Sequence, residues 1–157
     1  MHKKESEYLN GLNKAIRYCS YRERCEAEVS QKLKEWDLDQ SVGSRILEEL
    51  KREKYIDDRR YANTYAGSKF RVNGWGKIKI RAHLALKHIS KSIVNEAIDS
   101  LHYGQYLDKL EQLLRKKRSE VKGPDDYKKR IKVMNFGRSK GYEYDIIMDT
   151  MDRIFKD

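Results

Sequence analysis

Residues 29–50 read VSQKLKEWDLDQSVGSRILEEL, and this stretch decides the fold. Seven of its apolar side chains set the pattern: Val29, Leu33, Leu38, Val42, Ile46, Leu47 and Leu50. The first two lie four residues apart on one helical face, and the third falls in a short break. The last four form the apolar stripe of a second helix. The spacing therefore predicts a helix, a tight turn and another helix.

The same pattern recurs twice along the chain, which indicates a structural repeat. A shift of 51 residues places all seven positions on apolar residues: Ile80, Leu84, Ile89, Ile93, Ala97, Ile98 and Leu101. A further shift of 53 residues retains most of the pattern, with glycine and threonine at two positions: Val133, Gly137, Tyr142, Ile146, Thr150, Met151 and Ile154. Three similar units are therefore expected, of which the third is the most divergent.

One more helical stretch precedes each copy. These stretches carry Leu12, Ala15 and Ile16; Tyr61, Ala62, Tyr65 and Ala66; and Tyr106, Leu107, Leu110, Leu113 and Leu114. No alternation of Val, Ile and Thr predicts a strand, so an all-α fold is expected. We predict three tandem three-helix modules at residues 1–54, 55–102 and 103–157. They should stack into an elongated, curved array, because each module is too small to bury its own helices well.

Several residues are expected to mark helix starts. Asp39 and Ser90 stand at equivalent positions before the last helix of their modules, where a side-chain oxygen can accept a backbone N–H. Asp145 or Glu143 would serve less regularly in the third copy. Pro124 is expected at the first position of a helix, where its missing N–H costs nothing.

The charge of the chain indicates a polyanionic partner. The net charge is +10, the pI is near 9.5, and charged residues are as frequent as apolar ones, at 38% each. The second module has nine Lys and Arg against four Asp and Glu, whereas the first has twelve against eleven and the third fourteen against ten. Clustered Lys and Arg release counterions when they meet phosphate, so nucleic acid is the expected class of partner.

No Asp or Glu occurs in residues 59–95, although a solvated helix face normally mixes both signs. The basic residues of this stretch are our main candidates for a binding surface: Arg59, Arg60, Lys69, Arg71, Lys77, Lys79, Arg81, Lys87 and Lys91. Tyr65, Phe70, Asn73 and Trp75 interleave them, and such a mixture can hold phosphates while a ring stacks on a base. The alternative for the aromatic residues is a structural role in the core.

A second basic cluster can extend this surface into the third module: Arg115, Lys116, Lys117 and Arg118. The alternative is that these residues stabilise the negative end of a helix dipole.

The sequence lacks the motifs of an enzyme or a metal site. Its four histidines have no partner spacing for a metal ion, and neither phosphate-cradling glycine pattern occurs. Asp57–Asp58 and Asp125–Asp126 are expected to cap helices and not to act as acid and base. Cys19 and Cys25 are expected to pack between helices as free thiols. We therefore predict no catalytic residue, metal or cofactor.

No apolar run approaches the length of a membrane span, and the N-terminus lacks the apolar core of a signal peptide. A cytoplasmic protein without membrane contact is expected. A monomer is expected as well, because no heptad seam or broad apolar patch stands out.

Three stretches resemble the RecX family of regulators that act on RecA filaments. They are Tyr21-Arg22-Glu23-Arg24-Cys25 with Glu28, Leu33 and Lys34; Tyr55-Ile56-Asp57-Asp58-Arg59-Arg60-Tyr61-Ala62; and Gly74-Trp75-Gly76-Lys77-Ile78 with Arg81 and Leu84. They resemble the first two modules of the family in order, whereas residues 137–142 are only loosely similar to its third.

This resemblance implies three tandem three-helix modules that lie along the groove of a RecA filament on DNA. The chain would contact RecA and single- or double-stranded DNA through the two basic clusters, and would hinder filament growth, ATP turnover and strand exchange. The alternative is a sequence-independent helical DNA- or RNA-binding protein that acts on nucleic acid directly. A nuclease or other enzyme is disfavoured by the missing metal ligands.

Overall fold

A computed structural model describes residues 2–156, which form nine α-helices and no strand. The helices are α1 (His2–Tyr21), α2 (Glu26–Glu35), α3 (Gln40–Arg52), α4 (Asp58–Arg71), α5 (Lys77–Leu86), α6 (Lys91–Asp99), α7 (Tyr103–Glu120), α8 (Asp126–Ser139) and α9 (Tyr144–Ile154). Short turns connect them throughout.

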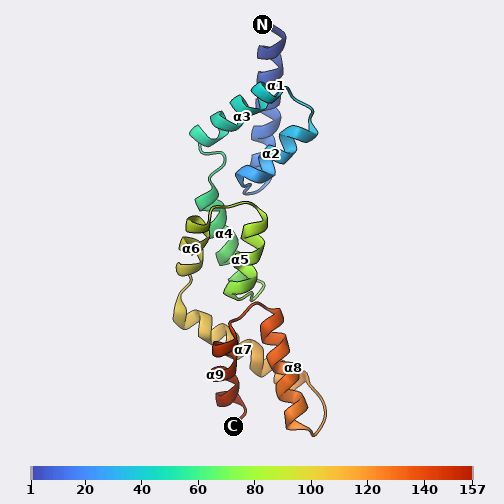
Figure 1. The fold of residues 1–157 in the computed structure, drawn as a ribbon, viewed down its shortest axis with the longest axis vertical. Coiled ribbons are helices and arrows are strands. Elements are labelled where there is room, and N and C mark those ends of the chain that lie inside the picture. The colour runs from blue at the N-terminus through green and yellow to red at the C-terminus, as the bar shows by residue number, and fades with distance from the viewer. Residues whose placement is uncertain (1, 157) are drawn as a thin grey trace.

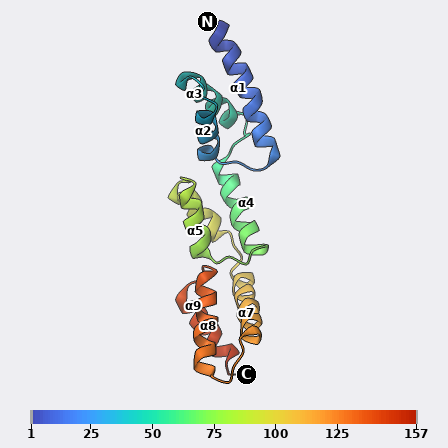
Figure 2. The same cartoon turned by 90° about the vertical axis from the view of Figure 1, so that its right-hand side faces the viewer.

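Helices α1–α3, α4–α6 and α7–α9 form three bundles that follow one another along a rod (Figures 1 and 2). We call these bundles modules 1, 2 and 3. Each pair of helices with extensive contact belongs to a single module. The predicted all-α array of three tandem three-helix modules is confirmed, whereas the exact boundaries at 1–54, 55–102 and 103–157 stay a prediction.

The repeated apolar positions form the core of each module. The first position is occupied by Val29, Ile80 and Val133, and each of these side chains is fully buried or nearly so. Thr150 is buried at a position that is otherwise apolar. Its hydroxyl donates to the carbonyl of Ile146 at 2.8 Å, so the core tolerates this polar residue.

The turn before the last helix of each module contains a residue with positive φ at the same position. Asp37, His88 and Gly141 stand at equivalent positions, with φ of 54°, 57° and 95°. This left-handed region favours glycine, and Asp and His adopt it more readily than most other residues. The shifts of 51 and 53 residues thus relate backbone conformations as well as apolar positions, and only module 3 uses glycine here.

The predicted caps of modules 1 and 2 are confirmed. The carboxylate of Asp39 accepts the N–H of Ser41 at 2.9 Å, and the hydroxyl of Ser90 accepts the N–H of Ile93 at 3.4 Å. In module 3 the cap position belongs to Glu143, whose side chain does not cap the helix.

The prediction for Pro124 is wrong. Helix α8 begins at Asp126, because the carboxylate of Asp125 caps it by accepting the N–H of Lys128 at 3.2 Å. Pro124 therefore precedes the cap and lies in the turn. A carboxylate directly after the proline was the stronger signal for the helix start.

The acidic pair before α4 has two different functions. Asp57 caps α4 as predicted, since its carboxylate accepts the N–H of Arg60 at 3.0 Å. Asp58 was expected to cap the same helix, but its carboxylate accepts the N–H of Glu26 at 2.8 Å. Glu26 is the first residue of α2, so Asp58 satisfies a helix start in the neighbouring module.

Charged side chains reinforce this joint between modules 1 and 2. Arg60 pairs with Glu23 at 2.7 Å, and Lys87 pairs with Glu28 at 3.4 Å. Each pair links a cation of module 2 to a carboxylate of module 1.

The buried residues fall into two clusters. One lies in module 1 and includes Ile56, and the other runs through modules 2 and 3 and includes Cys25. The expected burial between neighbouring modules therefore holds for modules 2 and 3, whereas module 1 has its own core. Ile56 thus packs into the core of module 1, whereas Cys25 and the partly buried Ala27 pack against the core of modules 2 and 3.

Glu28→Gln should destabilise the protein at neutral pH and reduce its sensitivity to acid. Glu28 accepts the N–H of Cys25 at 3.1 Å and pairs with Arg22 at 2.9 Å. Burial raises the pKa of this carboxyl, but the hydrogen bonds from Cys25 and Arg22 and the nearby charges outweigh burial, so the folded pKa is lowered. Because its pKa is lower in the folded protein, this carboxylate stabilises the fold at pH values above its unfolded pKa, which is near 4.5. This stabilisation is lost as the pH falls through the folded pKa.

The free energy of unfolding, measured with urea at neutral and acid pH, checks this expectation. The variant should lose about 1–2 kcal/mol at neutral pH and then lose less than the wild type on acidification. Glu35→Gln removes the same charge from the exposed end of α2 and is the matched control. Equal acid losses in the wild type and Glu28→Gln would contradict the expectation.

Candidate functional site

Three of the nine basic residues in the acid-free stretch pair with carboxylates from outside it. Arg59 pairs with Glu96 at 2.7 Å, and Arg60 and Lys87 pair with module 1 as described above. No acidic residue occurs within the stretch, but carboxylates from other segments lie next to it in the folded protein. These three cations therefore have carboxylate partners within the protein, and their place on a binding surface stays a prediction.

Three further cations of the stretch are exposed. The guanidinium of Arg71 folds back over Gly67, and Arg81 donates to the side chain of Asn95. Lys91 is exposed at the start of α6. No carboxylate within residues 2–156 forms an ion pair with Arg71, Arg81 or Lys91.

Two lysines of the stretch lie against the ring of Trp75. The ammonium groups of Lys69 and Lys79 are 4.9 Å and 4.6 Å from the ring centroid. The ring of Tyr65 lies edge-on to Trp75 at 6.4 Å, and the His83 ring is 4.6 Å away. Helices α4 and α5 each supply one lysine and one ring, and the turn between them supplies Trp75.

This turn contacts the turn between α8 and α9 in module 3. The N–H of Gly76 donates to the carbonyl of Lys140 at 2.7 Å, and the N–H of Ile78 donates to that of Gly141 at 2.9 Å. The ammonium of Lys140 donates to the carbonyl of Asn73 at 2.7 Å. A Cβ at residue 76 would lie 2.5 Å from the backbone of Gly141, so this approach requires glycine.

The contact brings cations from two modules together. Burial and the charge of Lys79 lower the pKa of Lys140, which places two like charges near each other. The ammonium of Lys77 lies 4.9 Å from the ring centroid of Tyr106 on α7. Lys140 was not predicted as part of the surface, because no spacing rule relates it to the distant Lys79; the basic turn around Lys140 was the only signal in the sequence.

Most residues of the second basic cluster interact with other residues of module 3. The guanidinium of Arg118 donates to the carbonyl of Ile154 near the end of α9. The ammonium of Lys117 lies 5.2 Å from the ring centroid of Phe136. Lys116 is exposed on α7. Lys117 and Arg118 thus contact other helices of module 3, whereas the choice between a binding surface and helix-dipole stabilisation stays a prediction.

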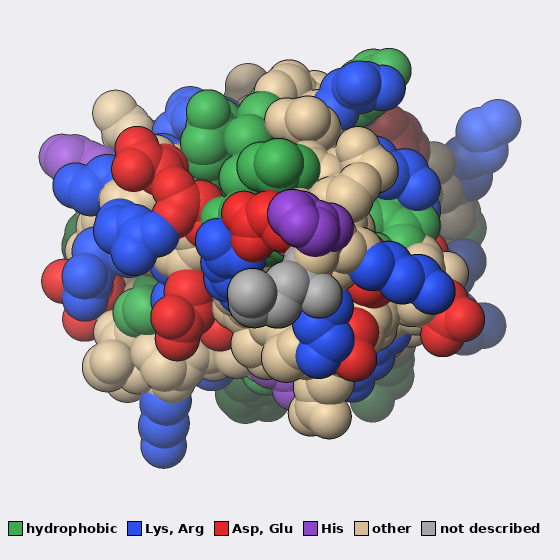
Figure 3. All heavy atoms as spheres, turned by 90° about the horizontal axis from the view of Figure 1, so that it is seen from above, with side chains coloured by type: hydrophobic (Ala, Val, Ile, Leu, Met, Phe, Trp, Pro, Cys, Tyr) green, Lys and Arg blue, Asp and Glu red, His purple; other side chains and the backbone are tan. Residues whose placement is uncertain are grey.

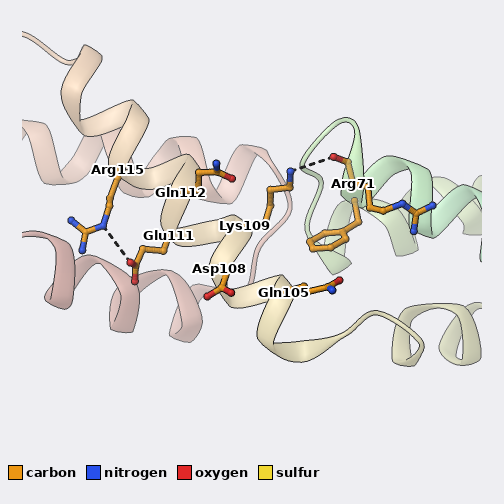
Figure 4. A pocket seen from close by; sticks show the side chains of 8 residues that line it. Arg71, Gln105, Asp108, Lys109, Glu111, Gln112 and Arg115 are labelled. Atoms are coloured by element: carbon orange, nitrogen blue, oxygen red, sulfur yellow. Dashed lines mark hydrogen bonds and ion pairs between the residues drawn. The ribbon is translucent and has the colours of Figure 1, made fainter.

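An open groove of about 640 Å³ lies between the end of α4 and one face of α7 (Figure 4). Its lining consists of Phe70, Arg71, Gln105, Asp108, Lys109, Glu111, Gln112 and Arg115. Lys109 donates to the carbonyl of Arg71 at 3.2 Å, and Arg115 donates to Glu111 at 3.3 Å. Because acidic, basic and amide groups alternate along α7, the groove favours neither sign of ligand charge.

Module 1 presents both signs of charge. In the view from its free end, acidic and basic side chains lie beside one another (Figure 3). Examples are the ion pairs of Arg45 with Glu5 at 2.9 Å and of Lys51 with Glu26 at 3.4 Å. This mixed surface agrees with the small excess of basic over acidic residues in this module.

No group of His, Cys, Asp and Glu side chains within residues 2–156 is arranged to hold a metal ion. None of the described helices combines the length and hydropathy of a membrane span. Both cysteines are free thiols that pack against the cores, as predicted: Cys19 in module 1 and Cys25 against module 2. Burial raises the pKa of Cys25 to about 11, so little thiolate forms at neutral pH.

Three family-domain descriptions match the chain in order. "RecX, first three-helix domain" matches residues 12–50, "RecX, second three-helix domain" matches residues 57–98, and "RecX, third three-helix domain" matches residues 104–151. One match therefore falls on each module.

Relatives named Regulatory protein RecX are similar along nearly the whole chain. The protein of Clostridium acetobutylicum is 27% identical, over 98% of this chain and 72% of that protein. The protein of Staphylococcus carnosus is 33% identical, over 96% of this chain and 56% of that protein. The chain thus spans only about half the length of its staphylococcal relatives.

Two crystal structures have the same arrangement of helices. RecX from Lactobacillus salivarius superposes with a TM-score of 0.89 at 25% identity, covering 98% of this chain and 99% of that one. A second structure, of a regulatory protein RecX, superposes with a TM-score of 0.84 at 24% identity, covering 94% and 74%, and supports the fold alone.

Proposed function

Because the chain belongs to the RecX family of regulatory proteins, we propose that it regulates RecA by binding along the RecA–DNA filament. Binding there would hinder filament growth, ATP turnover and strand exchange. The ordered match of all three family domains carries this proposal. We further propose that the protein acts in the cytoplasm as a monomer, without a cofactor and without catalytic activity of its own.

The shape and charge of the chain support a fibre as partner. A rod of three modules can contact several neighbouring subunits of a filament at once (Figures 1 and 2). A RecA filament on DNA also presents phosphates, which attract the unneutralised cations of modules 2 and 3.

We propose a RecA/DNA-binding surface that is narrower than the one expected from sequence. It consists of the candidate basic residues that form no ion pair and donate to no backbone carbonyl within residues 2–156: Lys69, Arg71, Lys77, Lys79, Arg81, Lys91, Lys116 and Lys117. Five candidates are left out: Arg59, Arg60, Lys87 and Arg115, which pair with carboxylates, and Arg118, which donates to the carbonyl of Ile154.

Charge reversal within this surface tests the proposed function. We expect the wild-type protein to inhibit ATP hydrolysis by RecA on single-stranded DNA. A variant with Lys77, Lys79 and Arg81 changed to Glu should need roughly tenfold more protein for the same inhibition, because three carboxylates would face a polyanion. The control changes Lys3, Lys4 and Lys34 of module 1 to Glu, which alters the net charge equally at exposed sites.

Inhibition by the control at wild-type concentrations, together with weak inhibition by the first variant, would support the surface. Absence of inhibition by the wild-type protein would overturn the proposed function itself. Equal weakening in both variants would show that only net charge matters.

A second function is favoured by the lysines that lie beside aromatic rings: direct, sequence-independent binding of nucleic acid. Filter binding to bare and RecA-coated DNA at several salt concentrations separates the two functions. Equal affinity and equal salt dependence on both substrates would favour the second function, whereas a preference for coated DNA would favour the RecA regulator.

A further inference from the structure

Four half-buried lysines surround the contact between modules 2 and 3: Lys69, Lys77, Lys79 and Lys140. None of them forms an ion pair with a carboxylate of residues 2–156. A partly desolvated ammonium normally acquires an opposite charge, because burial disfavours the charged form. Among the other half-buried lysines, Lys32 and Lys87 pair with Glu35 and Glu28, whereas Lys109, Lys117 and Lys129 form no ion pair with a carboxylate of residues 2–156. The feature particular to the four lysines is that they lie around one contact between two modules.

Neutral groups hold these ammonium ions in place without cancelling their charge. The Trp75 ring attracts Lys69 and Lys79 at 4.9 Å and 4.6 Å, and the carbonyl of Asn73 accepts from Lys140 at 2.7 Å. Ring faces and carbonyl oxygens carry partial negative charge only. The cations are therefore oriented before any ligand arrives, and their full positive charge remains.

The backbone beneath the lysines is fixed by two inter-module hydrogen bonds. The carbonyls of Lys140 and Gly141 accept from the N–H groups of Gly76 and Ile78. Lys79 lies one residue beyond Ile78 in α5. The backbone positions from which Lys79 and Lys140 extend are thus held together by these hydrogen bonds, which lowers the entropy lost when a ligand binds.

We propose that Lys69, Lys79 and Lys140 form a phosphate-binding site for single-stranded DNA at the contact between modules 2 and 3. A phosphodiester supplies the negative charge that the half-buried lysines lack. The site lies where two turns meet and is lined by half-buried side chains, so a flexible single strand can follow it more easily than a stiff duplex. The proposal rests on the proposed function for its partner, since a regulator on a RecA filament meets DNA, but its test contains no RecA.

Binding of oligo-dT to the full chain tests the site through its salt dependence. Each phosphate contact on a single strand contributes a slope of about 0.7 in the logarithm of affinity against the logarithm of salt. Changing Lys79 and Lys140 to Gln should therefore reduce the slope by about 1.4 and weaken binding about tenfold at low salt. The control changes Lys4 and Lys34 of module 1 to Gln and should retain the wild-type slope.

A second readout needs no change in the site. In a Trp36→Phe protein, Trp75 is the only tryptophan, so its fluorescence reports on the site. We expect oligo-dT to change this emission in a saturable manner, and duplex DNA of equal length to do so only at higher concentration.

An unchanged salt slope in the variant that carries both Lys79→Gln and Lys140→Gln would overturn the site. The site would also be overturned if the emission of Trp75 did not respond to oligo-dT. Tighter binding of duplex than of single strand would overturn the assigned partner. Because RecA is absent, these results are independent of the ATP hydrolysis test. If the protein inhibits RecA but shows neither the change in salt slope nor the response of Trp75, the proposed function is retained and this site is rejected.

Discussion

Replacing Gly141 by alanine should lower the free energy of unfolding by about 2–5 kcal/mol, because alanine meets two penalties there. Gly141 has a φ of +95°, which side chains rarely adopt. A Cβ at this position would also lie 2.6 Å from the backbone nitrogen of Lys79, which α5 holds in place. Asp37 and His88 have smaller positive φ, of 54° and 57°, at the equivalent positions, so alanine at residue 141 would meet a backbone angle that neither of them adopts. The backbone angle and the contact with Lys79 should therefore both contribute to the loss.

Gly43→Ala is the matched control for this substitution. Gly43 lies within α3, and no atom lies within 4 Å of the Cβ that alanine would add. Alanine in a helix interior is favoured over glycine by about 0.5–1 kcal/mol, so this variant should be more stable than the wild type. Urea unfolding of the three proteins measures both effects. A Gly141→Ala protein as stable as the wild type would show that the two turns are not in close contact.

Tyr106→Phe should lower the free energy of unfolding by about 1–3 kcal/mol through the loss of one hydroxyl. The fully buried Tyr106 donates to the carboxylate of Glu143 and accepts the N–H of Lys77 at 2.9 Å. Lys77 begins α5 after Gly76, which has no side chain to cap the helix. Phenylalanine would leave a helix N–H and a carboxylate without their partner, and these lie in two different modules.

Tyr142→Phe separates this effect from the general cost of altering a buried tyrosine. The two rings are neighbours, with centroids 4.9 Å apart, and both are buried. The hydroxyl of Tyr142 has no hydrogen-bond partner within residues 2–156. Its removal should leave stability unchanged or raise it, because an unpaired polar group no longer has to be buried. Equal destabilisation by both substitutions would contradict a special role for Tyr106.

The hydroxyl of Tyr106 makes the protein sensitive to alkali. Burial, and then the hydrogen bond to Glu143, raise the pKa of Tyr106 above its unfolded value of about 10. The neutral phenol contributes its full stabilisation at pH values below this unfolded pKa, and the stabilisation is lost as the pH rises above it. Tyr106→Phe should therefore lose less stability than the wild type between about pH 8 and about pH 11. Some alkaline loss should remain, since burial also raises the pKa of Tyr61 to about 12.

Local patterns predicted the helices and several of their starts correctly. Asp39 and Ser90 were identified as caps because capping depends on residues within one turn of each other. The partner of Asp58 could not be predicted in this way, since the helix that Asp58 caps begins 32 residues earlier in the chain. The sequence shows that Asp58 is next to a helix start, but not that a second helix start is closer to its carboxylate.

The ion pairing of the candidate cations could be predicted only in part, for a related reason. An acid-free stretch indicates unpaired cations only if carboxylates from other segments stay away, and Glu23 and Glu28 do not. Conversely, Lys140 joins the cations near Trp75 because two turns of different modules share backbone hydrogen bonds. Electrostatic interactions depend on distance in space and on burial, and neither follows from the position of a residue in the chain.

The sequence by itself determined three repeated three-helix modules, because the spacing of apolar residues within a few turns decides which face of each helix is buried. The net positive charge of the chain was also evident from composition. Only the tertiary structure decided that modules 2 and 3 share one core and that the carboxylates of module 1 neutralise Arg60 and Lys87. It also decided that unpaired lysines meet where two turns touch. These outcomes depend on contacts between segments far apart in the chain, which local spacing does not specify.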